Sequence, residues 1–123
     1  MILIAGLIAA AHPSLTIPVA FRGNWIDQHK GCDSGTIGAH LYVSARKLSD
    51  GEFDQHIDRL RRLSPRRLLI WTTVDTELPQ PRLTYDLRLS LDGKMERRVA
   101  EGHRSGRLKL FEREIDVRCG VGR

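Results

Sequence analysis

Three neighbouring residues have side chains that bind metal ions in other proteins. His29, Cys32 and Asp33 offer an imidazole, a thiolate and a carboxylate, which are all zinc ligands. Zinc sites usually combine two ligand pairs, and no C-x-x-C or second H-x-x-C pair follows in this chain. We therefore expect neither a metal site nor a cofactor.

Acid–base chemistry needs two positioned carboxylates, or a nucleophile with a base beside it. Asp50, Glu52 and Asp54 alternate around a turn signal, but acidic residues are common in turns. The sequence contains no nucleophile-elbow, zinc-protease, phosphate-loop or dinucleotide-binding motif. We expect no catalytic residues, and hence a protein that is not an enzyme.

The densest positive stretch of the chain surrounds Ser64-Pro65. It suits an anionic partner, such as lipopolysaccharide or an acidic protein, because guanidinium groups hold phosphates and carboxylates with two hydrogen bonds. A net charge of +5 favours the same class of partner. The stretch lacks the interleaved aromatic residues typical of nucleic-acid binding, so no nucleic acid is expected. The alternative is a solvated basic face paired with Asp54, Asp58 and Asp75. The arginines are Arg59, Arg61, Arg62, Arg66 and Arg67.

The two cysteines, Cys32 and Cys119, lie near the two ends of the chain, without the spacing of a redox or metal motif. This placement favours a disulfide in an oxidising compartment. Closing so long a loop would stabilise the fold by about 4 to 5 kcal/mol in the chain-entropy model. Two free thiols are the alternative.

Residues 1–11 are uncharged and apolar, and they end in Ala9-Ala10-Ala11, a form that signal peptidase cleaves. We predict a signal peptide over 1–11, a linker over 12–20, one domain over 21–119 and a tail over 120–123. The alternative for 1–11 is a buried strand or helix. The apolar run is too short to span a bilayer, and no later stretch is longer, so no transmembrane segment is expected. A periplasmic or secreted protein follows.

Strand and turn signals recur at close spacing from Ala20 onward. In the strand predicted over 83–91, leucines and Tyr85 fall on the core face, while Thr84, Asp86, Arg88 and Ser90 fall on the other. Asp92-Gly93 predicts a two-residue hairpin turn, after which the strand over 94–99 places Met95, Arg97 and Val99 on one side.

Four further strands are indicated. Residues 68–74 are apolar on both faces, which predicts a central strand covered on two sides. Leu41, Val43 and Ala45 alternate with His40, Tyr42 and Ser44. The last two strands are expected over 107–111 and 115–119.

The segment over 53–63 has two interpretations. Phe53, Ile57, Leu60 and Leu63 recur at helical spacing, whereas alternation with a period of two aligns Arg59 and Arg61 with Phe53. Periodicity alone favours a short helix.

Phe21-Arg22-Gly23-Asn24-Trp25 resembles the G-x-W opening of the calycin barrels, the lipocalins and their relatives. In those families the Trp closes one end of an up-and-down barrel, and an Arg of the last strand packs across its ring. The resemblance implies that Gly23 and Trp25 close a barrel here, with Arg113 or Arg118 as the arginine, and we choose Arg113. The resemblance also implies a strand over 53–63 and allows a small apolar ligand inside the barrel.

The chain from Ile17 onward also resembles a group of short exported bacterial proteins without known activity. The group ends in aromatic-x-Arg-Cys, whereas this chain has Glu114 after Arg113 and reaches Cys119 later, which puts the disulfide in doubt. The matching residues are Ile17-Pro18, Phe21, Gly23, Trp25, Cys32, Ser64-Pro65, Leu87, Leu89, Asp92-Gly93 and Phe111-Glu112-Arg113.

These observations predict a mainly β protein with a small antiparallel, lipocalin-like up-and-down barrel. Its expected role is noncovalent binding of an anionic envelope component or acidic protein through the arginine-rich surface. The alternative is a carrier of a small apolar ligand inside the barrel.

Overall fold

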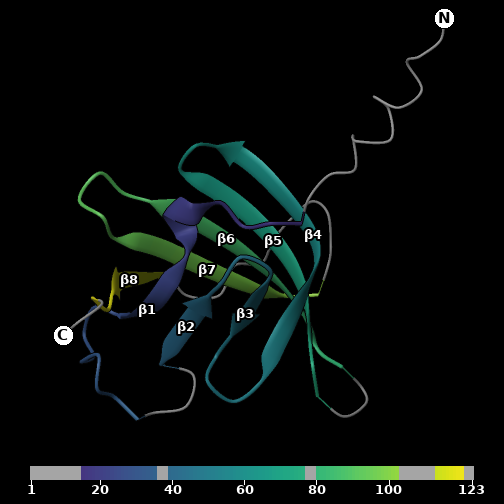
Figure 1. Cartoon of the computed structure of the whole chain (residues 1–123), viewed down its shortest axis with the longest axis horizontal. Helices are drawn as coiled ribbons and strands as arrows, with labels where there is room; N and C mark the ends of the chain where they lie inside the picture. The colour runs from purple at the N-terminus through teal and green to yellow at the C-terminus, as the bar shows by residue number, and fades with distance from the viewer. Residues whose placement is uncertain (1–14, 36–38, 77–79, 103–112, 121–123) are drawn as a thin grey trace, which may run out of the picture.

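Eight antiparallel strands close into one barrel in the computed structural model of the chain (Figure 1). The structure describes residues 15–35, 39–76, 80–102 and 113–120. The predicted signal peptide and the strand expected over 107–111 therefore lie outside the described residues. The strands are β1 (Gly23–Asp27), β2 (His40–Val43), β3 (Lys47–Ser49), β4 (Asp54–Ser64), β5 (Arg67–Val74), β6 (Arg82–Leu89), β7 (Met95–Glu101) and β8 (Glu114–Arg118).

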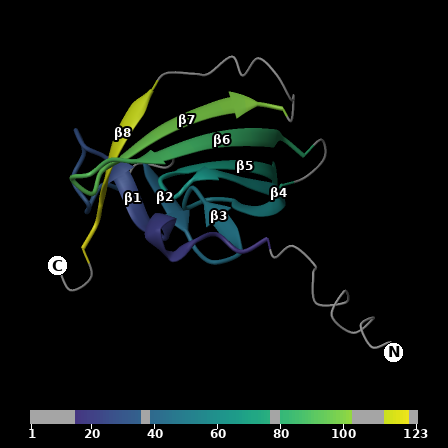
Figure 2. The same ribbon diagram turned by 90° about the horizontal axis from the view of Figure 1, so that it is seen from above.

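Each strand pairs with the next along the chain, and β8 pairs with β1 to close the barrel. The closing register places Trp25 opposite Arg118 and Asp27 opposite Asp116. Figure 2 shows β4 to β8 following one another along one wall. The predicted mainly β, up-and-down barrel is confirmed, and its closure gives every strand a neighbour on each side among the described residues.

One apolar cluster fills the barrel. Phe21 ends the short 3-10 turn over Val19–Phe21, and Ile17 precedes that turn. Both pack into the same cluster as Trp25. On β6 the alternation is as predicted, with Tyr85 and Leu87 in the cluster. The other members are Leu41, Val43, Leu48, Ile57, Leu68, Ile70 and Met95.

The prediction that Leu91 joins the core face was wrong, since 85% of Leu91 is exposed. It lies beyond the end of β6, in a turn that links Ser90 to Lys94 through a backbone hydrogen bond of 2.9 Å. The loop therefore has three residues rather than the predicted two. Gly93 occupies its last position with φ of 85°, a conformation that glycine adopts without strain.

The segment over 53–63, for which periodicity favoured a helix and the resemblance favoured a strand, forms strand β4. A bulge between Ile57 and Arg59 inserts one extra residue into the strand. Gln55 and Ile57 point inward before the bulge, and Leu60 is the next residue to point inward after it. The buried residues are then three apart, which mimics helical spacing. Leu63 lies near the exposed end of the strand and is 40% exposed.

Strand β5 is covered on both faces, as predicted. Leu68 and Ile70 belong to the interior cluster, while Trp71 is only 8% exposed on the outer face. The predicted strand that included Ala45 ends earlier, at Val43, and a turn over 44–46 leads into β3. Strand β3 was not predicted because three residues carry too little periodicity.

Among the described residues, two clusters of polar side chains also lie in the interior. Gln55 Oε1 accepts hydrogen bonds from Thr72 Oγ1 and Tyr85 Oη, both at 2.9 Å. Arg97 Nε lies 2.9 Å from Asp116 Oδ2, and its Nη2 also contacts Glu114. Burial raises the pKa of the Asp116 carboxyl to about 6, against the opposing charge of Arg97, and Asp27 raises it further.

Candidate anion-binding face

Arginines gather on the outer face of the wall from β4 to β8, because three cross-strand rows place them there. Arg61, Leu69, Asp86 and Arg98 form one row. Arg67, Arg88, Glu96 and Ile115 form the next row. Arg59 lies opposite Trp71 in a third. We call this surface the arginine face, defined as Arg59, Arg61, Arg67, Arg88, Arg98 and Arg113 with Asp86 and Glu96.

Two arginines share the single carboxylate of Asp86. Arg67 donates to both of its oxygens, with Nε at 3.2 Å and Nη2 at 3.0 Å. Arg88 Nη2 lies 3.5 Å from the same group. The Asp86 side chain is only 2% exposed, and its hydrogen bond raises the pKa of Arg67 above the ordinary value. Both arginines are thus held in place, yet one negative charge is shared between two positive charges.

Glu96 is shared in the same way. Its Oε1 lies 2.9 Å from Arg98 Nη2 and 3.8 Å from Arg113 Nε. Because the arginine face holds six guanidinium groups and two carboxylates, it has a surplus of four positive charges.

Arg59 is oriented by an aromatic ring. Its guanidinium carbon lies 4.9 Å from the ring centroid of Trp71, a cation–π contact that covers the indole on the outside of the barrel. Arg61 is exposed, two residues further along β4. In the described part of the chain no carboxylate lies within ion-pair distance of Arg61.

The five arginines predicted from sequence separate into two groups. Arg59, Arg61 and Arg67 belong to the arginine face, whereas Arg62 and Arg66 lie at the β4–β5 hairpin tip. Arg62 Nε donates to the Ser64 carbonyl at 3.4 Å, and the Arg66 carbonyl accepts from the Leu89 N–H at 2.8 Å. The tip adjoins the face, so all five arginines lie at one end of the same wall.

Sequence reasoning missed Arg88, Arg98 and the shared acids Asp86 and Glu96. The predicted alternation over 83–91 had already placed Asp86 and Arg88 on the outer face. The missing information was the strand order, which brings β6 and β7 beside β5.

The residues expected to close the barrel meet as the resemblance implied, with one change of arginine. Arg118, not Arg113, lies over Trp25, with 4.4 Å from its guanidinium carbon to the ring centroid. Arg118 Nη2 also donates to the Ala20 carbonyl at 2.8 Å. Our choice of Arg113 was wrong because Arg118 is the residue directly opposite Trp25 in the register, whereas Arg113 precedes β8 and approaches Glu96.

The predicted disulfide between Cys32 and Cys119 is present, with 5.7 Å between the Cα atoms. It ties the loop after β1 to the residue that follows β8. The Cys119 N–H also donates to the Asn24 carbonyl at 2.8 Å, so the bridge lies beside the seam that closes the barrel. Because Cys32 is oxidised, it cannot offer a thiolate to a metal ion with His29 and Asp33.

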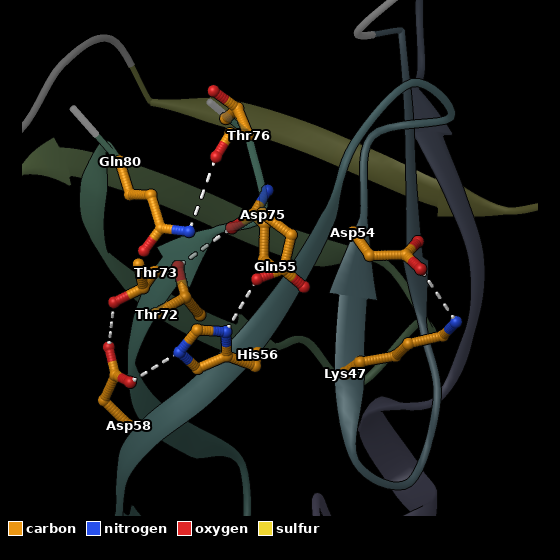
Figure 3. A network of polar contacts seen from close by, with 10 residues as sticks. All are labelled: Lys47, Asp54, Gln55, His56, Asp58, Thr72, Thr73, Asp75, Thr76 and Gln80. Carbon is orange, nitrogen blue, oxygen red and sulfur yellow. Dashed lines mark hydrogen bonds and ion pairs between the residues drawn. The ribbon is translucent and has the colours of Figure 1, made fainter. Parts of the chain in front are cut away.

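A second polar network lies on the outside of β4 and β5 (Figure 3). His56 lies between two carboxylates, with Nδ1 2.9 Å from Asp75 and Nε2 3.2 Å from Asp58. Thr73 Oγ1 donates to Asp58 at 2.6 Å rather than to the imidazole.

The three acids near the β3–β4 turn have structural contacts. Asp50 Oδ1 accepts from the N–H groups of Glu52 and Phe53, at 2.9 and 2.8 Å, which fixes the turn. Asp54 pairs with Lys47 at 3.1 Å (Figure 3).

Comparison of the chain with protein-family models, with curated proteins and with solved structures found no match. Within the described ranges, no helix has the length and apolar character needed to cross a bilayer.

Proposed function

We propose that this protein is an exported envelope protein that binds an anionic partner noncovalently through the arginine face and the adjoining hairpin tip. The partner is an anionic envelope component or an acidic protein surface. The observation that carries the proposal is the sharing of Asp86 and Glu96, each by two arginines, on a wall where Arg61 and Arg66 have no acidic partner among the described residues.

Several features of the face suit this role. A carboxylate shared by two arginines holds their planes in place but neutralises only one of them, so the remaining donors can bind a phosphate or a carboxylate. Because Trp71 orients Arg59, that side chain loses little conformational entropy on binding.

Export is part of the proposal. Disulfides persist in oxidising compartments and are rare in the cytosol, and this one joins residues 87 positions apart. That preference supports a periplasmic or secreted location, and the signal peptide predicted over 1–11, with cleavage after Ala11, would direct the export. Mass spectrometry of the protein recovered from periplasm would test this, since the chain should begin at His12 and carry the disulfide.

A binding measurement with inorganic polyphosphate, a soluble polyanion without apolar groups, tests the anionic partner. We expect binding at low ionic strength that weakens as salt is added. Replacing Arg61 or Arg66 by Ser should weaken binding about two- to fivefold each, because each loses one exposed ionic contact. Neither residue has an ion pair with another described residue, so both variants should fold normally.

Arg46→Ser is the matched control. Arg46 is exposed in the turn over 44–46 and is not one of the residues that define the arginine face, so its loss changes the net charge equally. The proposal fails if polyphosphate does not bind at low salt, or if Arg46→Ser weakens binding as much as Arg61→Ser.

The alternative of a small apolar ligand inside the barrel gains no support from the interior. Large side chains such as Trp25 and Phe21 fill the interior, and Tyr85 Oη donates a hydrogen bond to Gln55 Oε1 there. Small barrels are commonly filled in this way.

A further inference from the structure

A cleft of about 450 Å³ lies against the β6–β7 hairpin, beside the arginine face. Its apolar lining comes from Leu89, Leu91 and Ile115, and its basic lining from Arg88 and Lys94. The volume falls in the range of small-molecule sites, which combine apolar walls with a few polar groups. The hydrogen bond from the Leu89 N–H to the Arg66 carbonyl connects this cleft to the arginine-bearing hairpin tip.

The turn itself presents Leu91 to solvent. The Gly93 N–H donates to the Ser90 carbonyl at 3.2 Å, and Asp92 contacts Ser90 Oγ and the Lys94 N–H. These local bonds fix the loop, whereas Leu91 remains 85% exposed at the edge of the cleft. Leu91 therefore adds an exposed apolar side chain to the lining of the cleft.

The charges around the cleft favour an anion. The cleft also contains two acids, but Asp92 is bound within the turn, and Glu96 is shared by Arg98 and Arg113. Lys94 Nζ lies 3.5 Å from the Gln28 amide oxygen, and its charge also interacts with the Asp92 carboxylate. Arg88 shares Asp86 with Arg67, and its buried Nε has no hydrogen-bond partner among the described residues.

We propose that this cleft binds the apolar chain of a single-chain anionic amphiphile, whose headgroup contacts Arg88, Lys94 and the neighbouring arginines. This inference rests on the proposed function, because it uses the same positive surface for the headgroup. It adds that the partner is lipid-like, because a polyanion without apolar groups would make no apolar contact with Leu91 and Ile115.

The test compares methyl, butyl and octyl sulfate, each below the concentration at which micelles form, by calorimetry or by Trp fluorescence. Each methylene buried in the cleft should tighten binding about fourfold, so that affinity rises with chain length. Octyl glucoside, which has the same chain without the charge, should bind more weakly than octyl sulfate. Leu91→Ser should weaken octyl sulfate binding roughly three- to tenfold and leave polyphosphate binding unchanged.

Val19→Ser is the matched control, because Val19 is 73% exposed and lies outside the cleft. Both variants replace exposed side chains, and their folding can be verified by thermal unfolding. Equal affinity for butyl and octyl sulfate, equal affinity for octyl glucoside, or a Leu91→Ser variant that binds like the wild type would overturn the amphiphile site. If polyphosphate binding persists in that case, the proposed function stands without it; if polyphosphate also fails to bind, both fail.

Discussion

The guanidinium of Arg118 lies over the indole of Trp25, 4.4 Å from the ring centroid, across the seam where β8 meets β1. The indole in turn donates from Nε1 to the Phe21 carbonyl at 2.9 Å. Arg118 also donates a hydrogen bond to the Ala20 carbonyl. The side chains of Trp25 and Arg118 therefore attach the segment before β1 to the closing strand. The contact therefore joins the first and last strands of the barrel.

Replacing Arg118 by Ala should lower the free energy of unfolding by about 1 to 2 kcal/mol, because it removes a partly exposed cation–π contact and one hydrogen bond. Urea denaturation followed by tryptophan fluorescence measures this change. Arg113→Ala is the control, and its exposed contact with Glu96 at 3.8 Å should contribute less than about 0.5 kcal/mol. Similar losses in both variants would contradict a specific role for Arg118.

Gly23 allows that close packing. Its φ is 141°, and a Cβ at this position would lie 3.1 Å from Arg118 Nε. Gly23→Ala should cost about 1 to 3 kcal/mol of stability, because it strains the backbone and displaces the guanidinium. Gly35→Ala, where a Cβ would meet nothing within 4 Å, should change stability by less than about 0.5 kcal/mol. Denaturation curves of the two variants would show the contrast, and equal stabilities would rule out the steric explanation.

The disulfide should account for a large share of the stability. The loop between Cys32 and Cys119 contains β2 to β8, so the bridge restricts nearly the whole unfolded barrel. The double replacement of both cysteines by Ala should lower the free energy of unfolding by about 4 to 5 kcal/mol in the chain-entropy model. Urea denaturation of the wild type with and without a reductant gives an independent measure. An unchanged midpoint on reduction would contradict the prediction.

Asp116 should make stability depend on pH. Its pKa rises from the ordinary 3.8 to about 6 in the folded barrel, so the folded state binds its proton more tightly than the unfolded chain does. The stabilisation that this proton provides is complete below about pH 4 and is lost as the pH rises through 6.

The measurement is the difference in free energy of unfolding between the wild type and Asp116→Asn from pH 4 to pH 7. This difference should fall with rising pH and then level off, because the Asn variant lacks the titrating group. A difference that increases over the same range would mean that the attraction of Arg97 outweighs the cost of burying the carboxylate.

Local information was enough to predict much of the barrel. Alternation over 83–91 identified β6, because a strand with one buried face places its apolar residues two apart. It was misleading in β4, where the bulge at Ile57 and Arg59 shifts the inward positions and produces a helix-like spacing. A bulge depends on pairing with the neighbouring strand, so the spacing of residues within one segment cannot reveal it.

The candidate site likewise combines features that the sequence determined with features that only the tertiary structure decided. The sequence by itself determined that five arginines cluster around Ser64-Pro65, that two cysteines stand far apart in the chain, and that a Gly and a Trp open the first strand. Only the tertiary structure decided that Arg88 and Arg98 join that cluster, and that Arg118 rather than Arg113 covers Trp25. The physical reason is that strand order and register bring residues far apart in sequence to within a few ångströms, and both depend on how the whole barrel closes.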